Sequence, residues 1–171
     1  GGWVLHFAHC HPERVGSLIL VSSSGLDVSD VLEWELLKYP LIGSLLLKSL
    51  TPEAVRKRLI RSFHSTEPVT EQMVREVYLP MKFQHNRRLQ LLIARSQDWS
   101  VTERALPLIR HPSLIVWGEN DRYLPVGLVR RFEERPKNTK SFVLKECGHS
   151  PHEERPDEVN AVTTAFLHAQ R

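Results

Sequence analysis

The sequence is poor in cysteine and contains no long apolar run. Its two cysteines, Cys10 and Cys147, are too few and too far apart for the disulfide framework of a small secreted domain. We therefore expect a reducing compartment and predict a cytoplasmic protein. No apolar stretch approaches the roughly 18 residues that a membrane-spanning helix needs, so we also predict no membrane span.

A strong excess of one charge sign is also absent. The 23 Lys and Arg residues against 20 Asp and Glu residues leave a formal net charge of only +3. The basic clusters at 56–58, 87–88 and 130–131 lie in segments with helical apolar spacing, where a solvated helix face is the simpler interpretation. Neither interleaved aromatic residues nor a glycine-rich RNA-binding motif accompanies them. We therefore predict no nucleic-acid partner.

Two classes of cofactor are disfavoured by the motifs. No G-x-G-x-x-G follows a predicted strand, which argues against dinucleotide binding. His6, His9, Cys10 and His11 are potential zinc ligands, and His6 would share a helix face with His9 or Cys10. No second ligand pair with metal spacing occurs elsewhere in the sequence. We therefore predict neither a metal site nor another cofactor.

What the sequence does contain is the pattern of an α/β domain. With 41% hydrophobic residues, the composition is globular and supports a sizeable core. Leu18–Val21 is a short, uninterrupted apolar run, which is typical of a parallel strand buried on both faces. We predict further strands at residues 114–117 and 141–144, with helices at residues 3–9 and 126–134.

The last predicted helix begins at Pro156. Its apolar residues have the spacing i, i+3, i+7 and i+8, which is typical of a helix that packs on a sheet. These residues are Val159, Val162, Phe166 and Leu167.

Residues 27–99 contain only helical patterns. Thr51 and Pro52 have the residue types of an N-cap and a first helical residue, and Thr70 begins a second helix. The apolar faces of the three helices that we predict here consist of Val55, Leu59 and Phe63; of Met73, Val74, Val77 and Tyr78; and of Leu89, Leu92, Ile93 and Ser96. A long helical segment between two strand-containing regions indicates an inserted cap.

Two residues with catalytic side chains follow successive predicted strands. Asp121 ends the segment Trp117-Gly118-Glu119-Asn120-Asp121, and His149 lies in Cys147-Gly148-His149-Ser150-Pro151. Open α/β sheets place their sites beyond the carboxyl ends of the strands. We therefore expect the Asp121 carboxylate within hydrogen-bond reach of the His149 ring, at one edge of the sheet beneath residues 27–99.

Two alternatives to this role of Asp121 stay open. Asp121 has the residue type of an N-cap for the following helix, a role compatible with catalysis. The acid could instead follow the preceding strand, but that place reads Ser22-Ser23-Ser24-Gly25 and Asp27 lies farther along. The position therefore favours Asp121.

Three motifs together resemble the α/β-hydrolase family from the end of its nucleophile elbow onward. They are Gly1-Gly2-Trp3 with the strand that ends in Val21-Ser22-Ser23, Trp117-Gly118-Glu119-Asn120-Asp121, and Cys147-Gly148-His149-Ser150-Pro151. The resemblance implies an incomplete α/β-hydrolase parallel sheet, namely the last three strands with flanking helices, and an inserted helical cap. It divides the chain into an elbow helix and core strand (1–26), the cap (27–99) and the C-terminal part of the core (100–171).

The resemblance also implies roles for individual residues. Asp121 matches the acid that orients the catalytic histidine, and His149 matches the general base. Gly1 and Gly2 match the glycines that let the elbow helix approach the neighbouring strand. The nucleophile is expected two positions before Gly1, and the oxyanion donors also lie upstream, so no nucleophile is assigned within the sequence.

The resemblance leaves several reactions open for the complete protein. Carbon–carbon hydrolases and epoxide hydrolases often carry Trp directly after the catalytic histidine, where this sequence has Ser150. We therefore predict cleavage of small carboxylic esters, with a hydrophobic small molecule as substrate, by a Ser-Asp-His acyl-enzyme mechanism. The alternatives are an epoxide hydrolase or haloalkane dehalogenase with an Asp nucleophile, a carbon–carbon hydrolase, and a noncatalytic ligand receptor.

The 171-residue chain, expressed by itself, is expected to be insoluble or molten and to give no ester turnover. Strand Leu18–Val21 should pair with an upstream strand, and without it an apolar edge and uncovered sheet faces remain. Solubility, thermal unfolding and ester hydrolysis measure the outcome. A sharp thermal transition from a soluble monomer, or hydrolysis that His149→Ala abolishes, would contradict this expectation.

Overall fold

The computed structural model describes residues 1–65, 69–134 and 138–170. The chain divides into two compact units, each described here by itself. Unit 1 contains Gly1–Asp27, Ser62–Ser65 and Trp99–Arg171, and unit 2 contains Val28–Arg61 and Thr66–Asp98.

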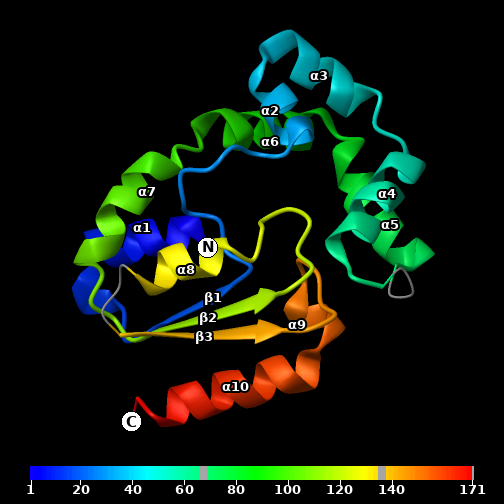
Figure 1. The fold of residues 1–171 in the computed structure, drawn as a ribbon. Helices are drawn as coiled ribbons and strands as arrows, with labels where there is room; N and C mark the ends of the chain where they lie inside the picture. The colour runs from blue at the N-terminus through cyan, green and yellow to red at the C-terminus, as the bar shows by residue number, and fades with distance from the viewer. Residues whose placement is uncertain (66–68, 135–137, 171) are drawn as a thin grey trace. The chain divides into compact units, whose positions relative to one another are not determined.

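Unit 1 is built on a three-stranded parallel sheet. Its strands are β1 (Leu18–Val21), β2 (Ser113–Gly118) and β3 (Thr139–Leu144), in the order β1-β2-β3 (Figure 1). Leu18 pairs with Ser113, which in turn pairs with Thr139. The predicted parallel sheet is confirmed, and β2 and β3 are each two residues longer than predicted.

Helices cover both faces of this sheet. Helix α10 (Pro156–His168) lies against one face, and α1 (Gly2–Cys10) and α8 (Leu128–Glu133) lie against the other (Figure 1). Helix α10 begins at Pro156 as predicted, with Asp157 and Glu158 in its first turn, where negative charge favours the helix dipole. The shorter elements of unit 1 are η1 (Pro12–Arg14), α7 (Trp99–Ala105), η2 (Leu106–Leu108) and α9 (Pro151–Glu154).

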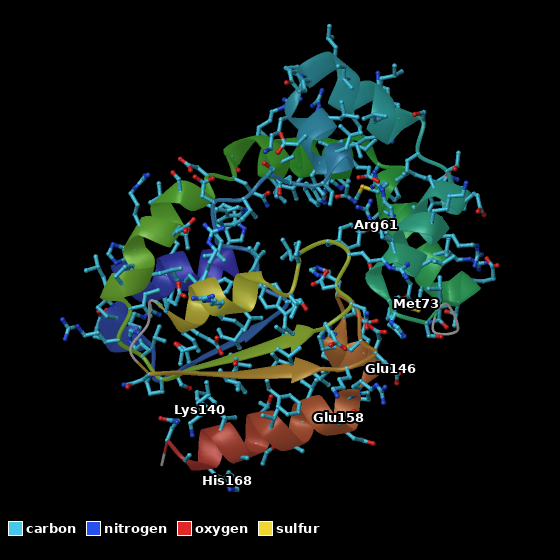
Figure 2. The ribbon with its side chains drawn as sticks, viewed as in Figure 1. Arg61, Met73, Lys140, Glu146, Glu158 and His168 are labelled. Carbon is cyan, nitrogen blue, oxygen red and sulfur yellow. The ribbon has the colours of Figure 1, made fainter. Side chains whose placement is uncertain are left out.

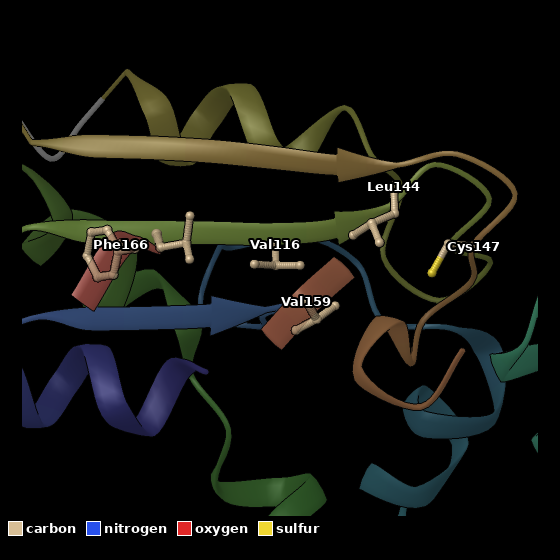
Figure 3. Close-up of a cluster of buried hydrophobic side chains, with 6 residues drawn as sticks. Val116, Leu144, Cys147, Val159 and Phe166 are labelled. Atoms are coloured by element: carbon tan, nitrogen blue, oxygen red, sulfur yellow. The ribbon is translucent and has the colours of Figure 1, made fainter. Parts of the chain in front are cut away.

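Strand β2 is buried over its whole length because its alternate side chains enter two layers. On one face, Leu114 and Val116 belong to a cluster completed by Leu144, Cys147, Val159 and Phe166 (Figure 3). On the other face, the Trp117 ring contacts the Phe132 ring of α8 with centroids 6.0 Å apart. This two-sided burial holds the carboxyl end of β2 in a fixed position.

The predicted stripe of α10 is partly wrong. Val159 and Phe166 are buried, and Val162 packs against their cluster, as predicted. Leu167 is 42% exposed. A helix advances about 100° per residue, so Leu167 points away from the sheet face that Phe166 occupies.

Unit 2 contains only helices in its described part. These are α2 (Leu32–Lys38), α3 (Pro40–Lys48), α4 (Pro52–Ser62, whose last residue belongs to unit 1), α5 (Glu71–Met81) and α6 (Gln84–Ser96). The predicted caps are present: the Thr51 hydroxyl accepts from the amide of Ala54, and the Thr70 hydroxyl accepts from the amide of Met73. Helices α2, α3 and α6 share a core of Trp34, Leu37, Leu47, Leu91 and Ala94.

All three predicted helical faces differ in part from the structure. In α5, Val74 is buried as predicted, but the predicted Val77 is 47% exposed. In α6, Leu91 and Ala94 are buried, whereas the predicted Leu89 and Leu92 are exposed, so the apolar face has a different phase. Phe63 is buried but lies one residue beyond α4 and belongs to unit 1.

None of the helices formed by the described residues is both long and apolar enough to cross a membrane.

Replacement of Phe166 tests the sheet–helix core in the complete protein that carries this sequence. Phe166→Ala removes a buried ring and should lower the free energy of unfolding by about 3–5 kcal/mol. The adjacent Leu167→Ala is the matched control, and as a surface substitution it should change that free energy by less than about 0.5 kcal/mol. Chemical denaturation measures both, and equal effects would contradict the assignment of the α10 face.

Candidate active site

The loop after β2 holds Asp121 rigidly. Its Oδ1 accepts hydrogen bonds from the amides of Tyr123 (2.8 Å) and Leu124 (2.9 Å), and its side chain is fully buried. The N-cap of the following helix α8 is Gly127, so the alternative role of Asp121 as the N-cap of that helix is wrong, and its carboxylate instead caps the turn directly after β2. They also leave Oδ2 available in a single orientation.

The loop after β3 brings His149 to that oxygen. His149 Nδ1 lies 2.8 Å from Asp121 Oδ2, and the His149 side chain is 31% exposed. An ionised carboxylate only accepts hydrogen bonds, so Nδ1 donates and Nε2 is the ring nitrogen that can accept a proton. The ring of Tyr123 lies 5.3 Å from the His149 ring, centroid to centroid.

Two glycines allow close backbone contacts here: Gly118 lets the two loops meet, and Gly148 lets the histidine loop approach Ser62. A Cβ on Gly118 would lie 2.0 Å from the carbonyl oxygen of Gly148, and a Cβ on Gly148 would lie 2.5 Å from the carbonyl oxygen of Ser62. Because the obstructing atoms belong to the backbone, side-chain rotation cannot relieve either clash. The amide of Asn120 also donates to the carbonyl of Cys147 at 2.9 Å, which joins the loops directly.

Glu154 of α9 anchors the histidine loop. Its Oε1 accepts from the amide of Gly148 at 2.6 Å, and its Oε2 accepts from the amide of His64 at 2.7 Å. The amide of His149 itself donates to the carbonyl of Ser62 at 2.7 Å. The sequence analysis predicted no role for Glu154 or for the segment Ser62–Ser65.

Cys147 precedes the two loop residues Gly148 and His149 but is unsuited to act as a nucleophile. Its side chain is buried, and burial, followed by the nearby Glu154 carboxylate, raises the pKa of its thiol to about 12. The thiol therefore stays protonated near neutral pH, and a protonated thiol is a poor nucleophile. Its role is packing in the cluster beneath the site.

The outer side of the histidine loop carries an exposed charge cluster. Arg155 reaches Glu146 at 3.6 Å and Glu158 at 3.7 Å, and both acidic residues are labelled in Figure 2. Exposed ion pairs at such distances contribute little stability. The orientation of His149 therefore depends on the hydrogen bonds that Asp121, Glu154 and the carbonyl of Ser62 make with its loop.

The predicted elbow glycines lie at the start of α1 and contact other parts of unit 1. A Cβ on Gly1 would lie 1.7 Å from Ser23 Oγ, in the loop after β1, and a Cβ on Gly2 would lie 2.1 Å from the Trp99 ring. Both glycines thus permit a close approach to neighbouring elements. They are not bonded to Asp121 or His149.

Asp27, the alternative acid, and the potential zinc ligands of α1 make contacts that do not involve His149. The amide of Asp27 donates to Glu103, and the histidine partner found in the described residues is Asp121. Cys10 Sγ and His6 Nε2 lie 3.6 Å apart on α1. Among residues 1–65, 69–134 and 138–170, no group of three or more His, Cys, Asp or Glu side chains could hold a metal ion.

The sheet, its flanking helices and the Asp–His pair are features of one family. A sequence model of the alpha/beta hydrolase family matches residues 1–162. The chain therefore belongs to the alpha/beta hydrolase family, as the sequence motifs predicted.

Individual relatives agree with this assignment. A 2-hydroxy-6-oxo-6-phenylhexa-2,4-dienoate hydrolase of Comamonas testosteroni is 25% identical to this chain, covering 98% of it and 59% of the relative. The structure of the enzyme of the same name from Rhodococcus sp. strain RHA1 has a TM-score of 0.80 at 19% identity, covering 96% of this chain and 59% of that one. A bacterial membrane phospholipase A has a TM-score of 0.73 at 27% identity, covering 100% and 55%. The chain thus spans less than two thirds of the length of each.

Substitution of Gly118 tests whether the two loops need their close approach. In the complete protein, Gly118→Ala should lower the free energy of unfolding by about 3 kcal/mol, because the added methyl group overpacks against backbone. Gly127→Ala is the matched control, since a Cβ there meets no atom within 4 Å. It should change stability by less than about 1 kcal/mol. Chemical denaturation that finds the two variants equally stable would show that the loops do not meet at Gly118.

Proposed function

We propose that the complete protein carrying this sequence is a hydrolase in which His149 is the general base and Asp121 its orienting acid. The observation that carries the proposal is the 2.8 Å contact between His149 Nδ1 and the buried, doubly held carboxylate of Asp121. A buried acid that fixes the histidine tautomer is the arrangement that activates a hydroxyl nucleophile. Membership of the alpha/beta hydrolase family supports the same chemistry.

In the proposed mechanism, His149 Nε2 takes the proton of a serine hydroxyl while the serine oxygen attacks the substrate carbonyl. The resulting imidazolium is stabilised by Asp121 and donates its proton to the leaving group, which departs and leaves an acyl-enzyme. Water then loses a proton to Nε2 and attacks the acyl group, and the serine recovers its proton from His149. We place this serine two positions before Gly1, with Gly1 and Gly2 as elbow glycines.

For the substrate, we propose a small, hydrophobic carboxylic ester. The support is Ser150 directly after His149, a place where carbon–carbon hydrolases of the family often carry Trp. The helical residues 27–99 would act as the cap that shapes the substrate pocket. Both parts of the proposal concern the complete protein.

Carbon–carbon bond hydrolysis is the second candidate. Its support is the relative from Comamonas testosteroni, whose name describes a 2-hydroxy-6-oxo-6-phenylhexa-2,4-dienoate hydrolase. The same histidine and acid can serve this reaction, because it also passes through attack on a carbonyl carbon. Parallel assays with p-nitrophenyl esters and with that dienoate separate the two candidates by their ratio of kcat/KM.

Substitution of the Asp–His pair tests the mechanism in the complete protein. His149→Ala should lower kcat by about 10³-fold or more, and Asp121→Asn nearly as much, because the amide cannot fix the same tautomer. His152→Ala, which removes an exposed histidine three residues away, should leave kcat unchanged. Turnover by His149→Ala equal to that of the parent protein, with either substrate, would overturn the proposed general base.

A further inference from the structure

Helix α3 of unit 2 has an apolar face that no neighbouring helix covers. Gly43 and Leu47 are buried on its inner side. On the other side, Leu41 is 86% exposed and Leu45 is 68% exposed, and Ile42 and Leu46 are exposed beside them. We call Leu41, Ile42, Leu45 and Leu46 the α3 outer face. Four large apolar residues on one short helix form a patch that soluble surfaces rarely present without a partner.

The segments that contain α3 and α6 are basic and carry no acid, whereas α2, which packs against both helices, carries Glu33 and Glu35. No Asp or Glu occurs in residues 36–52 or in residues 77–97, which include α3, its packing partner α6 and the turn before α6. The cations in these two segments are Lys38, Lys48, Lys82, Arg87, Arg88 and Arg95. Of these, Lys38 is paired with Asp30 and Glu35 of unit 2.

The net positive charge of the chain is also concentrated in unit 2. Unit 2 holds 11 Lys and Arg residues against 8 Asp and Glu residues, whereas the rest of the chain holds 12 of each. The whole formal charge of +3 therefore belongs to the helical unit.

A cavity of about 220 Å³ lies at the C-terminal end of α3. Lys48, Lys82 and Arg87 line it, together with Leu47 of the α3 core and Tyr78. Lys82 Nζ lies 5.6 Å from the centre of the Tyr78 ring, and Arg87 donates to the carbonyls of Met81 and Lys82, which holds its guanidinium in place. Three cations around one small cavity suit a phosphate group.

We propose that unit 2 docks on an anionic lipid surface. The α3 outer face enters the boundary between headgroups and acyl chains, and the cavity cations bind lipid phosphates. Apolar residues that project near lysines and arginines are the combination that interfacial helices use. A second copy of this chain fits less well, because a symmetric contact would bring together two surfaces that both carry excess positive charge.

Vesicle co-sedimentation of the complete protein tests this docking. The protein should bind vesicles of phosphatidylcholine with phosphatidylglycerol and bind pure phosphatidylcholine weakly, with binding that falls as salt rises. The double variant Leu41→Ser, Leu45→Ser should reduce binding more than tenfold without changing the melting temperature. The double variant Lys48→Glu, Lys82→Glu should reduce binding by at least about 25-fold, since each cation contributes about fivefold.

Matched controls lie in unit 1. Leu108→Ser removes an apolar side chain that is also well exposed, and Lys140→Glu makes the same charge reversal at the start of β3, where Lys140 is labelled in Figure 2. Both should bind vesicles like the parent protein.

Three results would overturn the proposal. The first is equal binding to neutral and anionic vesicles, or equal binding by the α3 variants and their controls. The second is a parent protein whose mass in solution halves in the leucine variant, which would assign the face to a second copy. The third is a parent protein that does not bind vesicles, together with a leucine variant whose melting temperature is lower. That result would mean that another segment of the protein covers this face. Each readout is independent of hydrolytic activity.

Discussion

The close approach of two backbone loops at the carboxyl edge of the sheet is the constraint on which the candidate site depends. Parallel pairing of β2 with β3 makes both strands end at the same edge, so their loops leave side by side. Gly118 then lets the loops come closer than a side chain would allow, and Gly148 lets the histidine loop approach Ser62. Only at that separation can the Asp121 carboxylate reach the His149 ring at 2.8 Å.

The remaining polar bonds of the site make this arrangement rigid. Both oxygens of Asp121 are engaged, and both oxygens of Glu154 accept backbone amides of the histidine loop or its neighbour. The proposed role of His149 as general base would require its ring to keep one orientation through two proton transfers, and bonds to backbone suit that requirement better than flexible side-chain pairs. Beneath the site, Cys147 contributes volume and no reactive thiolate.

The contact between Asp121 and His149 could be predicted from sequence because both residues follow strands of one parallel sheet. Parallel strands bring the loops after them to the same edge of the sheet, while the glycine at the loop contact sets the final distance. The roles of Glu154 and Ser62 could not be predicted in the same way. Their partners are backbone amides and carbonyls that carry no residue-type signal, and Ser62 is distant from the histidine loop in sequence.

The errors in helix phase have a different cause. Periodicity identifies α6 and α10 as helices, but Leu89, Leu92 and Leu167 are apolar residues on exposed faces, so an apolar stripe alone does not mark the buried side. In α10, Phe166 is buried because it packs in the cluster on the sheet, and in α6, Leu91 is buried because it packs against α2 and α3.

Both units expose some large apolar side chains, but they differ in their charge. Unit 1 buries the apolar residues of its central strand on both faces and carries balanced charge, as a scaffold for a precise site requires. Unit 2 exposes the apolar residues of α3 and carries the net positive charge, and an exposed apolar patch lowers solubility. An exposed apolar surface that lowers solubility is best explained by a binding partner that covers it. The chemistry of the Asp–His pair and the surface of the helical unit are therefore separable properties, and substitutions in one need not alter the other.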